Sequence, residues 1–354
     1  MNPSRLIRVK FMARGMRQDI QPERWVRQLP GTENTWKSCR FIFDVHCREY
    51  DWLAVFHDIH RDKWSFASEP LACPREKTLL VTTEPSTITV YGTDYLRQFG
   101  VVLTSQEPWV ISHPNVVFTQ PGLIWFYGVP LSGGRMLTYD EIAAIPPMEK
   151  TRKISTVCSS RVGKLTLHYK RVQFTDRLKA ELPELDVFGH GVHPMSDKAD
   201  ALDPYEYHIA IENHVYPHHL TEKLPDAFLG YTLPFYHGCP NALDYFPRES
   251  FISIDFEDYK RTRDVIRSTI ANDEYADRLP YIIEARRRVL EDLNLFAVLE
   301  REIGSHDKIP HGREPYGLIM NRQTLRIKRP LAGLRSLAEK AITKSRHKFG
   351  WGQA

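Results

Sequence analysis

The chain lacks the cysteine patterns that build disulfide frameworks or familiar zinc sites. Its 354 residues contain only five cysteines, an odd number, and none of them belongs to a CxxC pair. Dispersed single cysteines are typical of proteins from a reducing compartment. We therefore expect free thiols and a cytoplasmic protein.

Long hydrophobic runs are missing as well. The longest apolar stretch, GLIWFYGVPL, is far shorter than the roughly 20 residues that a membrane-spanning helix needs. The start of the sequence, MNPSRLIRVKFMARGMRQ, has basic residues but no apolar core of the kind found in signal peptides. The sequence thus predicts neither a membrane span nor a secretion signal.

A strong charge of one sign is also absent. The net charge is +4, with 42% hydrophobic and 26% charged residues, which is ordinary for a globular protein and excludes a disordered chain. So small a positive surplus suits an anionic ligand or a membrane surface, but it does not by itself argue for nucleic acid. The length is enough for two domains.

The first half of the chain has the pattern of a parallel α/β sheet. Near-continuous apolar segments at 6–13, 51–59, 78–84 and 100–105 predict buried strands, with a short helix near 89–99. Ligands collect beyond the carboxyl ends of such strands. The polar residues expected at that edge are His57, Asp58, Glu84, Ser105 and Gln106.

The pattern restarts after the proline-containing stretch 142–153, which we interpret as a linker. Strands are predicted at 153–160, 185–191, 207–213, 232–238 and 251–256, with helices at 168–180 and 221–230 and a long helical region from 261. We therefore predict an N-terminal domain over 1–145, a C-terminal domain over 154–320 and a basic tail over 321–354.

The tail differs in composition from the rest of the chain. Residues 322–348 carry nine lysines and arginines against one acid, Glu339. An amphipathic helix is predicted, with one apolar face made of Leu331, Leu334, Ala338, Ala341 and Ile342. A helix packed on the body and an interfacial helix on anionic lipid both fit this pattern. Nucleic acid is not the expected partner.

The stretch HIAIENHVYPHHLTEKLPDAFLG, residues 208–230, combines a strand, a polar loop and a helix start. The strand delivers Glu212 and Asn213 at its carboxyl end, and Thr221 is the predicted N-cap of the helix. A helix N-terminus with Lys223 beside it suits a diphosphate, while Glu212 and Glu222 can accept hydrogen bonds from sugar hydroxyls. An ordinary capped helix with no ligand explains the same spacing.

The three histidines of this stretch do not predict a metal site. His214, His218 and His219 fit no zinc motif, and Pro217 argues against a helix that holds two of them one turn apart. We therefore expect no metal.

Sequence motifs in the second half of the chain resemble those of a known family. The stretch 211–256, IENHVYPHHLTEKLPDAFLGYTLPFYHGCPNALDYFPRESFISIDF, resembles the C-terminal signature of the α-1,3-fucosyltransferases, glycosyltransferase family 10. Upstream, Arg171, Phe174 and Leu178 match the family's R-x-x-Y/F-x-x-x-L, and LDVFGHG resembles its D-V-Y/F-G. The resemblance covers about residues 155–258.

The resemblance implies a GT-B fold, in which two Rossmann-like domains face each other across a cleft, with C-terminal helices. It implies inverting, metal-independent transfer of L-fucose from GDP-fucose to a glycan, with Glu84 as the catalytic base and no cofactor. A bacterial-type member would act on a lipopolysaccharide-type glycan or glycolipid, peripherally at the inner face of the membrane. The implied donor-binding residues are Arg171, Glu212, Asn213, Tyr216, His219, Thr221, Glu222 and Lys223.

One departure from the family affects the pocket. The family's A-G-T is G-Y-T here, and the ring of Tyr231 is expected to crowd the backbone approach unless Gly230 compensates. A transferase that uses another GDP-sugar is therefore one open alternative. A non-catalytic protein that binds sugar nucleotides is the other.

Overall fold

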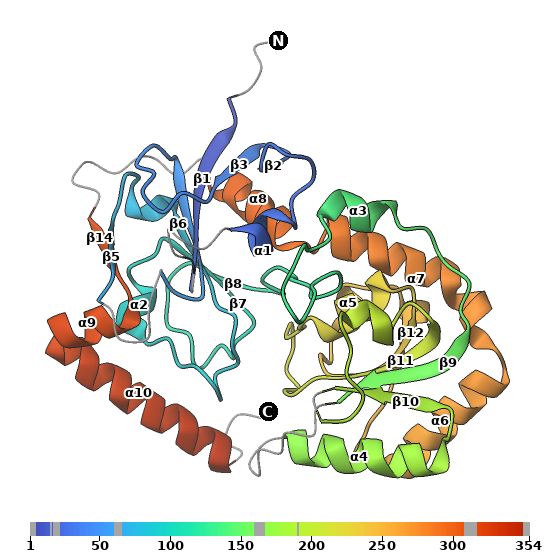
Figure 1. The fold of residues 1–354 in the computed structure, drawn as a ribbon. Coiled ribbons are helices and arrows are strands. Elements are labelled where there is room, and N and C mark those ends of the chain that lie inside the picture. Colours follow the sequence, from blue (N-terminus) through green and yellow to red (C-terminus); the bar gives the residue numbers. More distant parts are fainter. Residues whose placement is uncertain are drawn as a thin grey trace. The chain divides into compact units, whose positions relative to one another are not determined.

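The computed structural model describes residues 5–14, 16, 22–59, 66–158, 167–189, 191–307 and 317–349. The chain forms two compact units: unit 1 comprises Met1–Pro121 and Phe296–Ala354, and unit 2 comprises Gly122–Leu295 (Figure 1). This division differs from the predicted boundaries at 145 and 320, because the chain returns to unit 1 after residue 295. The stretch 142–153, interpreted as a linker, lies inside unit 2.

Unit 1 is built on a seven-stranded sheet with the order β2-β3-β1-β4-β6-β7-β8. Neighbouring strands pair in parallel except β2 with β3, which are antiparallel. The strands are β1 Ile7–Ala13, β2 Thr35–Trp36, β3 Cys39–Ile42, β4 Trp52–Phe56, β6 Thr78–Val81, β7 Val101–Thr104 and β8 Val116–Phe118. The four strands predicted in this half are confirmed as β1, β4, β6 and β7.

The central strands of this sheet are buried along nearly their whole length. β6 and β7 expose no residue, and β4 is buried except at its last position. Strands covered on both faces need apolar side chains on both, which explains their continuous apolar runs. The short strands β2, β3 and β8, of which β2 and β8 form the edges of the sheet, lack such a run, so periodicity did not detect them.

Helices and a two-stranded sheet complete unit 1. They are the helices α1 Glu23–Val26, α2 Thr93–Leu96, α8 Leu295–His306, α9 Arg322–Lys328 and α10 Pro330–Phe349, the 3-10 helix Arg75–Lys77, and the antiparallel pair β5 Ser68–Pro70 with β14 Leu318–Met320. In the described part of the chain, no helix is both long and apolar enough to cross a membrane.

Aromatic packing explains why the chain returns to unit 1. Phe296, near the start of α8, lies 5.5 Å from the ring of Phe11 on β1 and 4.8 Å from the ring of Phe41 on β3. These centroid distances are typical of favourable ring contacts. Residues 281–303, which belong to the helical region predicted from 261, are therefore divided between two helices, α7 in unit 2 and α8 in unit 1 (Figure 1).

Unit 2 is built on a five-stranded, wholly parallel sheet with the order β10-β9-β11-β12-β13. Its strands are β9 Arg152–Val157, β10 Leu185–Phe188, β11 Tyr205–Ile211, β12 Leu233–His237 and β13 Ile252–Ser253. Its helices are α3 Tyr139–Ala144, α4 Leu167–Glu181, α5 Lys223–Leu229, α6 Tyr259–Ala271 and α7 Glu274–Glu291, with 3-10 helices at Lys198–Ala201, Ala242–Asp244 and Arg248–Ser250. The predicted α/β class is confirmed in both units.

A buried ion pair ties β1 to β5 in unit 1. Lys10 is 0% exposed, and its Nζ donates to the carbonyl oxygens of Val45 and Cys47 at 2.7 and 3.1 Å. The same Nζ lies 2.8 Å from Oε1 of Glu69, whose side chain is 6% exposed and also accepts from Arg48. A lysine in the middle of a buried strand is tolerated because its charge and its three donors are all satisfied.

We predict that Lys10→Met destabilises unit 1, because Glu69 would remain buried with half-exposed Arg48 as its cation. The free energy of unfolding should fall by about 3 kcal/mol or more. Urea denaturation measures the loss, and Lys10→Met with Glu69→Leu should recover part of it. Equal stability of Lys10→Met and the wild type would contradict this account.

Candidate active site

The carboxyl end of β11 brings most of the predicted donor residues together. β11 ends at Ile211, Glu212 and Asn213 follow it directly, and α5 begins at Lys223. Arg171 reaches the same place from α4, where its Nη1 donates to the carbonyl oxygen of Ile211 and to Oδ1 of Asn213 at 3.3 and 3.1 Å. Six of the predicted donor residues thus form one cluster: Arg171, Glu212, Asn213, Thr221, Glu222 and Lys223.

Glu212 holds the loop to the strand. Its side chain is 0% exposed; Oε1 accepts the backbone N–H of Thr221 at 2.9 Å, and Oε2 accepts its hydroxyl at 2.5 Å. Gly238 after β12 makes room for it, since a Cβ there would lie 2.5 Å from Cγ of Glu212. A carboxylate so placed orients its neighbours and has little surface left for a ligand.

Lys223 and Glu222 form a charged pair beside this carboxylate. Nζ of Lys223 lies 3.1 Å from Oε1 of Glu222 and 3.3 Å from Oε2 of Glu212. Burial alone would lower the pKa of Lys223, but the two carboxylates raise it, so the ammonium stays charged. The side chain remains 20% exposed and can therefore meet a ligand.

Lys198 belongs to the cluster although the sequence did not suggest it. Its Nζ lies 2.6 Å from the buried Asp226 and 3.7 Å from Glu222. Burial would raise the pKa of Glu222, but Lys223 and Lys198 together lower it to about 2. No spacing signal links residue 198 to the T-E-K stretch, because the 3-10 helix that carries it precedes β11.

Arg171 is the most informative member of the cluster. It is 7% exposed, yet its hydrogen bonds go to neutral oxygens, and its Nε has no partner among the described residues. A buried guanidinium normally has its donors satisfied and its charge compensated. With Lys223 close enough to affect it electrostatically, the pair is suited to an anion.

The predicted N-cap is wrong. α5 begins at Lys223, its N-cap is Glu222, and no side-chain cap forms there. The hydroxyl of Thr221 donates to Glu212 instead and accepts from Lys223 at 2.9 Å. The carboxylate of Glu212 is a stronger partner for this hydroxyl than a backbone N–H of the helix. Only the tertiary structure shows that the two side chains are close.

The histidine-containing loop also serves the structure. His219 is buried with its ring 6.1 Å from that of His214, and Tyr216 is half-buried. His218 has a left-handed backbone, φ 64°, and its Nδ1 lies 2.5 Å from the hydroxyl of Tyr245. In the described residues, no three His, Cys, Asp or Glu side chains are placed to hold a metal ion.

Tyr231 points out of the cluster. It occupies a left-handed position, φ 53°, where glycine is favoured, and its hydroxyl donates to the carbonyl oxygen of Ile145 at 2.7 Å. The guanidinium of Arg286 lies 4.5 Å from its ring centroid. The expectation that this ring crowds the donor pocket is therefore wrong, because its partners are residues of the 142–153 stretch and α7.

Glu84 lies in unit 1, three residues beyond β6, with its side chain exposed. Its carbonyl oxygen accepts Nε2 of Gln106 at 2.6 Å, which joins two of the residues predicted at this edge. His57 and Asp58 lie at the end of β4, in contact with Arg322, which is 2.8 Å from His57 and 3.1 Å from Asp58. Arg322 was not foreseen because 264 residues separate it from Asp58.

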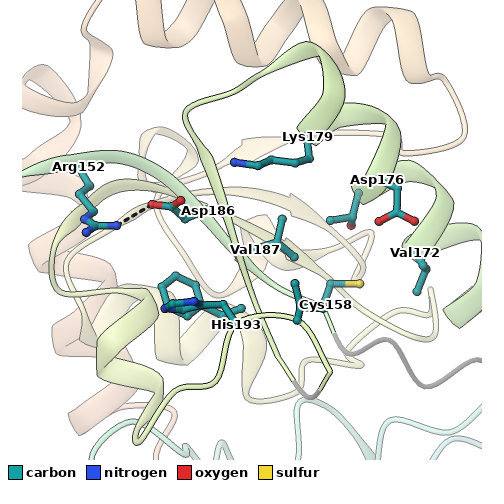
Figure 2. A pocket seen from close by; sticks show the side chains of 11 residues that line it. Arg152, Cys158, Val172, Asp176, Lys179, Asp186, Val187 and His193 are labelled. Carbon is teal, nitrogen blue, oxygen red and sulfur yellow. Dashed lines mark hydrogen bonds and ion pairs between the residues drawn. The ribbon is translucent and has the colours of Figure 1, made fainter.

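A cavity in unit 2 involves none of the predicted donor residues. It has a volume of about 460 Å³ and lies between α4 and the edge strand β10, as Figure 2 shows. Val172, Val187 and Phe188 give it apolar walls, and the ion pair of Arg152 with Asp186, 2.9 Å long, lies at its rim. The cations in its lining are already engaged, Arg152 by Asp186 and Lys179 by the carbonyl oxygen of Pro183.

A fold of two α/β units has a counterpart among solved proteins. A crystal structure of an α1,3-fucosyltransferase superposes with a TM-score of 0.51 and 14% identity, over 89% of this chain and 94% of that chain. At this identity the similarity shows the fold alone. The predicted GT-B class of glycosyltransferase folds is confirmed.

Sequence comparison matches one region of the chain to a known family. Residues 148–277 match the model of the glycosyltransferase family 10 (fucosyltransferase) C-terminal region, in agreement with the predicted resemblance. The matched segment includes the whole cluster from Arg171 to Lys223. Glu84 lies outside it.

Curated relatives with similar sequences are also fucosyltransferases. The 3-galactosyl-N-acetylglucosaminide 4-α-L-fucosyltransferase of Bos taurus is 33% identical over 118 residues, which is 31% of this chain and 31% of that protein. The α-(1,3)-fucosyltransferase of Helicobacter pylori is 30% identical over 74 residues, 21% of this chain and 16% of that protein. The chain thus matches about a third or less of the length of these relatives.

We predict that Glu222 makes stability depend on acid pH. Its folded pKa of about 2 lies below the ordinary 4.5, so its contribution is present above pH 4.5 and is lost as the pH falls toward 2. The thermal midpoint should fall less steeply across this window in Glu222→Gln than in the wild type. Exposed Glu184, replaced by Gln, is the control, and parallel curves for wild type and Glu222→Gln would contradict the assignment.

Proposed function

We propose that the chain is an inverting, metal-independent glycosyltransferase that moves L-fucose from GDP-fucose to a hydroxyl of a surface glycan of the lipopolysaccharide type. The observation that carries the proposal is the buried guanidinium of Arg171, whose Nε has no partner among the described residues. A diphosphate would supply the missing acceptor and the missing negative charge.

The residues of the cluster have distinct roles in this proposal. Arg171 and Lys223 bind the diphosphate and stabilise the charge that grows on it as GDP leaves. Glu222, whose side chain is 24% exposed, accepts hydrogen bonds from hydroxyls of the donor. Glu212 is a positioning residue, because its carboxylate is engaged by Thr221 and Lys223. Asn213, Tyr216 and His219 line the pocket by resemblance to the family.

The transfer itself is a displacement at the anomeric carbon. The acceptor oxygen forms a bond to C1 of fucose while the bond from C1 to the phosphate oxygen breaks, and its electron pair leaves with GDP. The acceptor proton goes to a carboxylate, for which Glu84 is our candidate. The guanidinium of Arg171 and the ammonium of Lys223 offset the charge of the leaving group. The proposed step therefore requires no divalent cation.

The proposal includes a location. A glycolipid acceptor is presented at a membrane, so we place the reaction in the cytoplasm, peripherally at the inner face. The basic segment 322–348 supports this part, because cationic residues are attracted to anionic lipid.

GDP binding tests the anion site. We predict that Arg171→Ala and Lys223→Ala each weaken GDP affinity by about 1.5–3 kcal/mol, the range of hydrogen bonds to charged groups. Isothermal titration calorimetry measures the change. Lys170→Ala is the matched control, since Lys170 adjoins Arg171 on α4 but is exposed and pairs with Glu257. Unchanged affinity in both site variants would overturn the donor site.

Turnover tests the candidate base separately. With GDP-fucose and a glycan acceptor, Glu84→Gln should lower the rate of GDP release by about 100-fold or more while GDP affinity stays the same. Exposed Glu76, replaced by Gln, serves as the control in unit 1. A normal rate in Glu84→Gln would remove Glu84 as the base and leave the donor site intact.

A donor screen separates the alternatives. GDP-fucose, GDP-mannose and UDP-sugars are offered to the wild-type protein with the same acceptors. Turnover with GDP-mannose but not GDP-fucose would favour another GDP-sugar. GDP binding without turnover on any donor would favour the non-catalytic alternative.

A further inference from the structure

A buried histidine of unit 1 is in contact with two arginines at one ring nitrogen. Nη1 of Arg14, directly after β1, lies 3.2 Å from Nε2 of His57, and Nη2 of Arg322, at the start of α9, lies 2.8 Å from the same atom. The other ring nitrogen, Nδ1, lies 2.7 Å from the hydroxyl of Thr83 and 3.0 Å from that of Tyr91. Because guanidinium groups only donate, Nε2 is the acceptor and Nδ1 carries the proton.

Among the described residues, the charges in direct contact at this cluster do not balance. Two guanidinium groups meet at a neutral imidazole. The carboxylate of Asp58 lies 3.1 Å from Arg322 and also accepts the hydroxyl of Tyr95 at 2.8 Å. In the part of the chain that the structure describes, the guanidinium of Arg14 has His57 as its hydrogen-bond partner and no carboxylate beside it. Like charges repel, and a neutral lone pair compensates them poorly, so an anion here would be stabilised.

The two arginines differ in exposure. The side chain of Arg322 is 16% exposed and lies 4.9 Å from the ring centroid of Tyr91, so it is held in place. Arg14 is exposed, and the remaining N–H groups of its guanidinium are open to solvent. His57 between them has a left-handed backbone, φ 72°, which is uncommon outside glycine and concentrates at binding sites. A fixed cation beside an accessible one is suited to an oxyanion.

The position of Glu84, the candidate base, connects this cluster to the acceptor. Thr83, whose hydroxyl contacts His57, directly precedes Glu84 in the chain. Glu84 is also close enough to Tyr91 to affect it electrostatically. An anionic group held at Arg14 would therefore keep the sugar that carries it near this carboxylate.

We infer that Arg14 and Arg322 bind an oxyanion, a carboxylate or a phosphate, that the acceptor glycan carries. The planar fork of Arg14 donates two parallel hydrogen bonds to the oxyanion, and Arg322 adds a second positive charge. The acceptor class is therefore an acidic glycan, which contains a uronic acid or a sugar phosphate. That the anion belongs to the acceptor rests on the proposed function, whereas oxyanion binding at the two arginines does not.

Binding without a sugar nucleotide tests the oxyanion site alone. The probes are methyl galactoside, its 6-phosphate and methyl galacturonide, titrated into the full chain and followed by ligand-observed NMR. Each anionic probe should bind about tenfold or more tightly than the neutral one, and Arg14→Gln should abolish the difference. Arg14→Lys should restore part of it, because lysine keeps the charge without the fork. Arg97→Gln, which replaces an exposed arginine of unit 1 outside the cluster, is the control.

Three results would overturn the inference. The first is equal binding of neutral and anionic probes by the wild type. The second is a preference for anions that Arg171→Ala abolishes and Arg14→Gln keeps, because the probes would then bind at the donor cluster. The third is inorganic phosphate that binds as tightly as the sugar 6-phosphate, because the site would then hold a free anion. Thermal unfolding of Arg14→Gln should match the wild type, since Arg14 is exposed.

Turnover extends the test to the acceptor. With GDP-fucose and matched acidic and neutral glycans, Arg14→Gln should lower the ratio of kcat/KM for the acidic acceptor to that for the neutral one by about tenfold, chiefly through KM. An unchanged ratio would overturn the assignment of the oxyanion to the acceptor. Absence of turnover with every donor would instead remove the proposed function and leave the binding result standing.

Discussion

The buried carboxylate of Glu212 is the contact on which the candidate site depends. It lies at the end of the central strand β11 and accepts both the N–H and the hydroxyl of Thr221. These two bonds return the chain to the strand after the loop and place Glu222 and Lys223 at the carboxyl edge of the sheet. Gly238 on the neighbouring strand end is small enough to let the carboxylate fit. Without this carboxylate Thr221 would lose both of these bonds, and the ammonium of Lys223 would lose one of its two carboxylate partners.

A second set of contacts, within unit 1, joins the C-terminal segment of the chain to the end of β4. Arg322, at the start of α9, contacts His57 and Asp58 at the end of β4, and its guanidinium lies 4.9 Å from the ring centroid of Tyr91. Burial and the charges of Arg322 and Arg14 lower the pKa of His57 to about 3, so the imidazole is neutral and can accept from both guanidinium groups. Contacts of Arg322 with Asp58 and of His347 with Ser86 therefore attach both ends of the tail to the part of unit 1 that contains Glu84. The apolar side chains of Leu331, Leu334 and Ile342 on α10 remain exposed.

In unit 1, periodicity predicted the strands that are buried on both faces and missed the short strands at the edges. The runs that became β4, β6 and β7 are apolar at nearly every position, and only a sheet covered on both sides requires that. β2 and β8 are two and three residues long, too short for a period to show. The donor cluster was also predicted in most of its members, because strand end, loop and helix start follow one another closely in the sequence. Lys198, Arg322 and the true partner of Thr221 were not, since each acts across a distance in the chain that no local pattern records.

The sequence by itself determined the α/β class, the family 10-like motifs from Arg171 to Lys223 and the amphipathic character of the tail. Each of these depends on residue order within a short window. Tertiary structure decided which side of an amphipathic element turns inward and which charges meet. The apolar side of α10 turns outward because its small, polar side fits the N–H of Thr93 and the hydroxyl of Ser86. Tyr231 leaves the donor cluster because its ring finds Arg286 and its hydroxyl finds Ile145. Burial and hydrogen bonding between distant segments made these choices, and they depend on the folded chain as a whole.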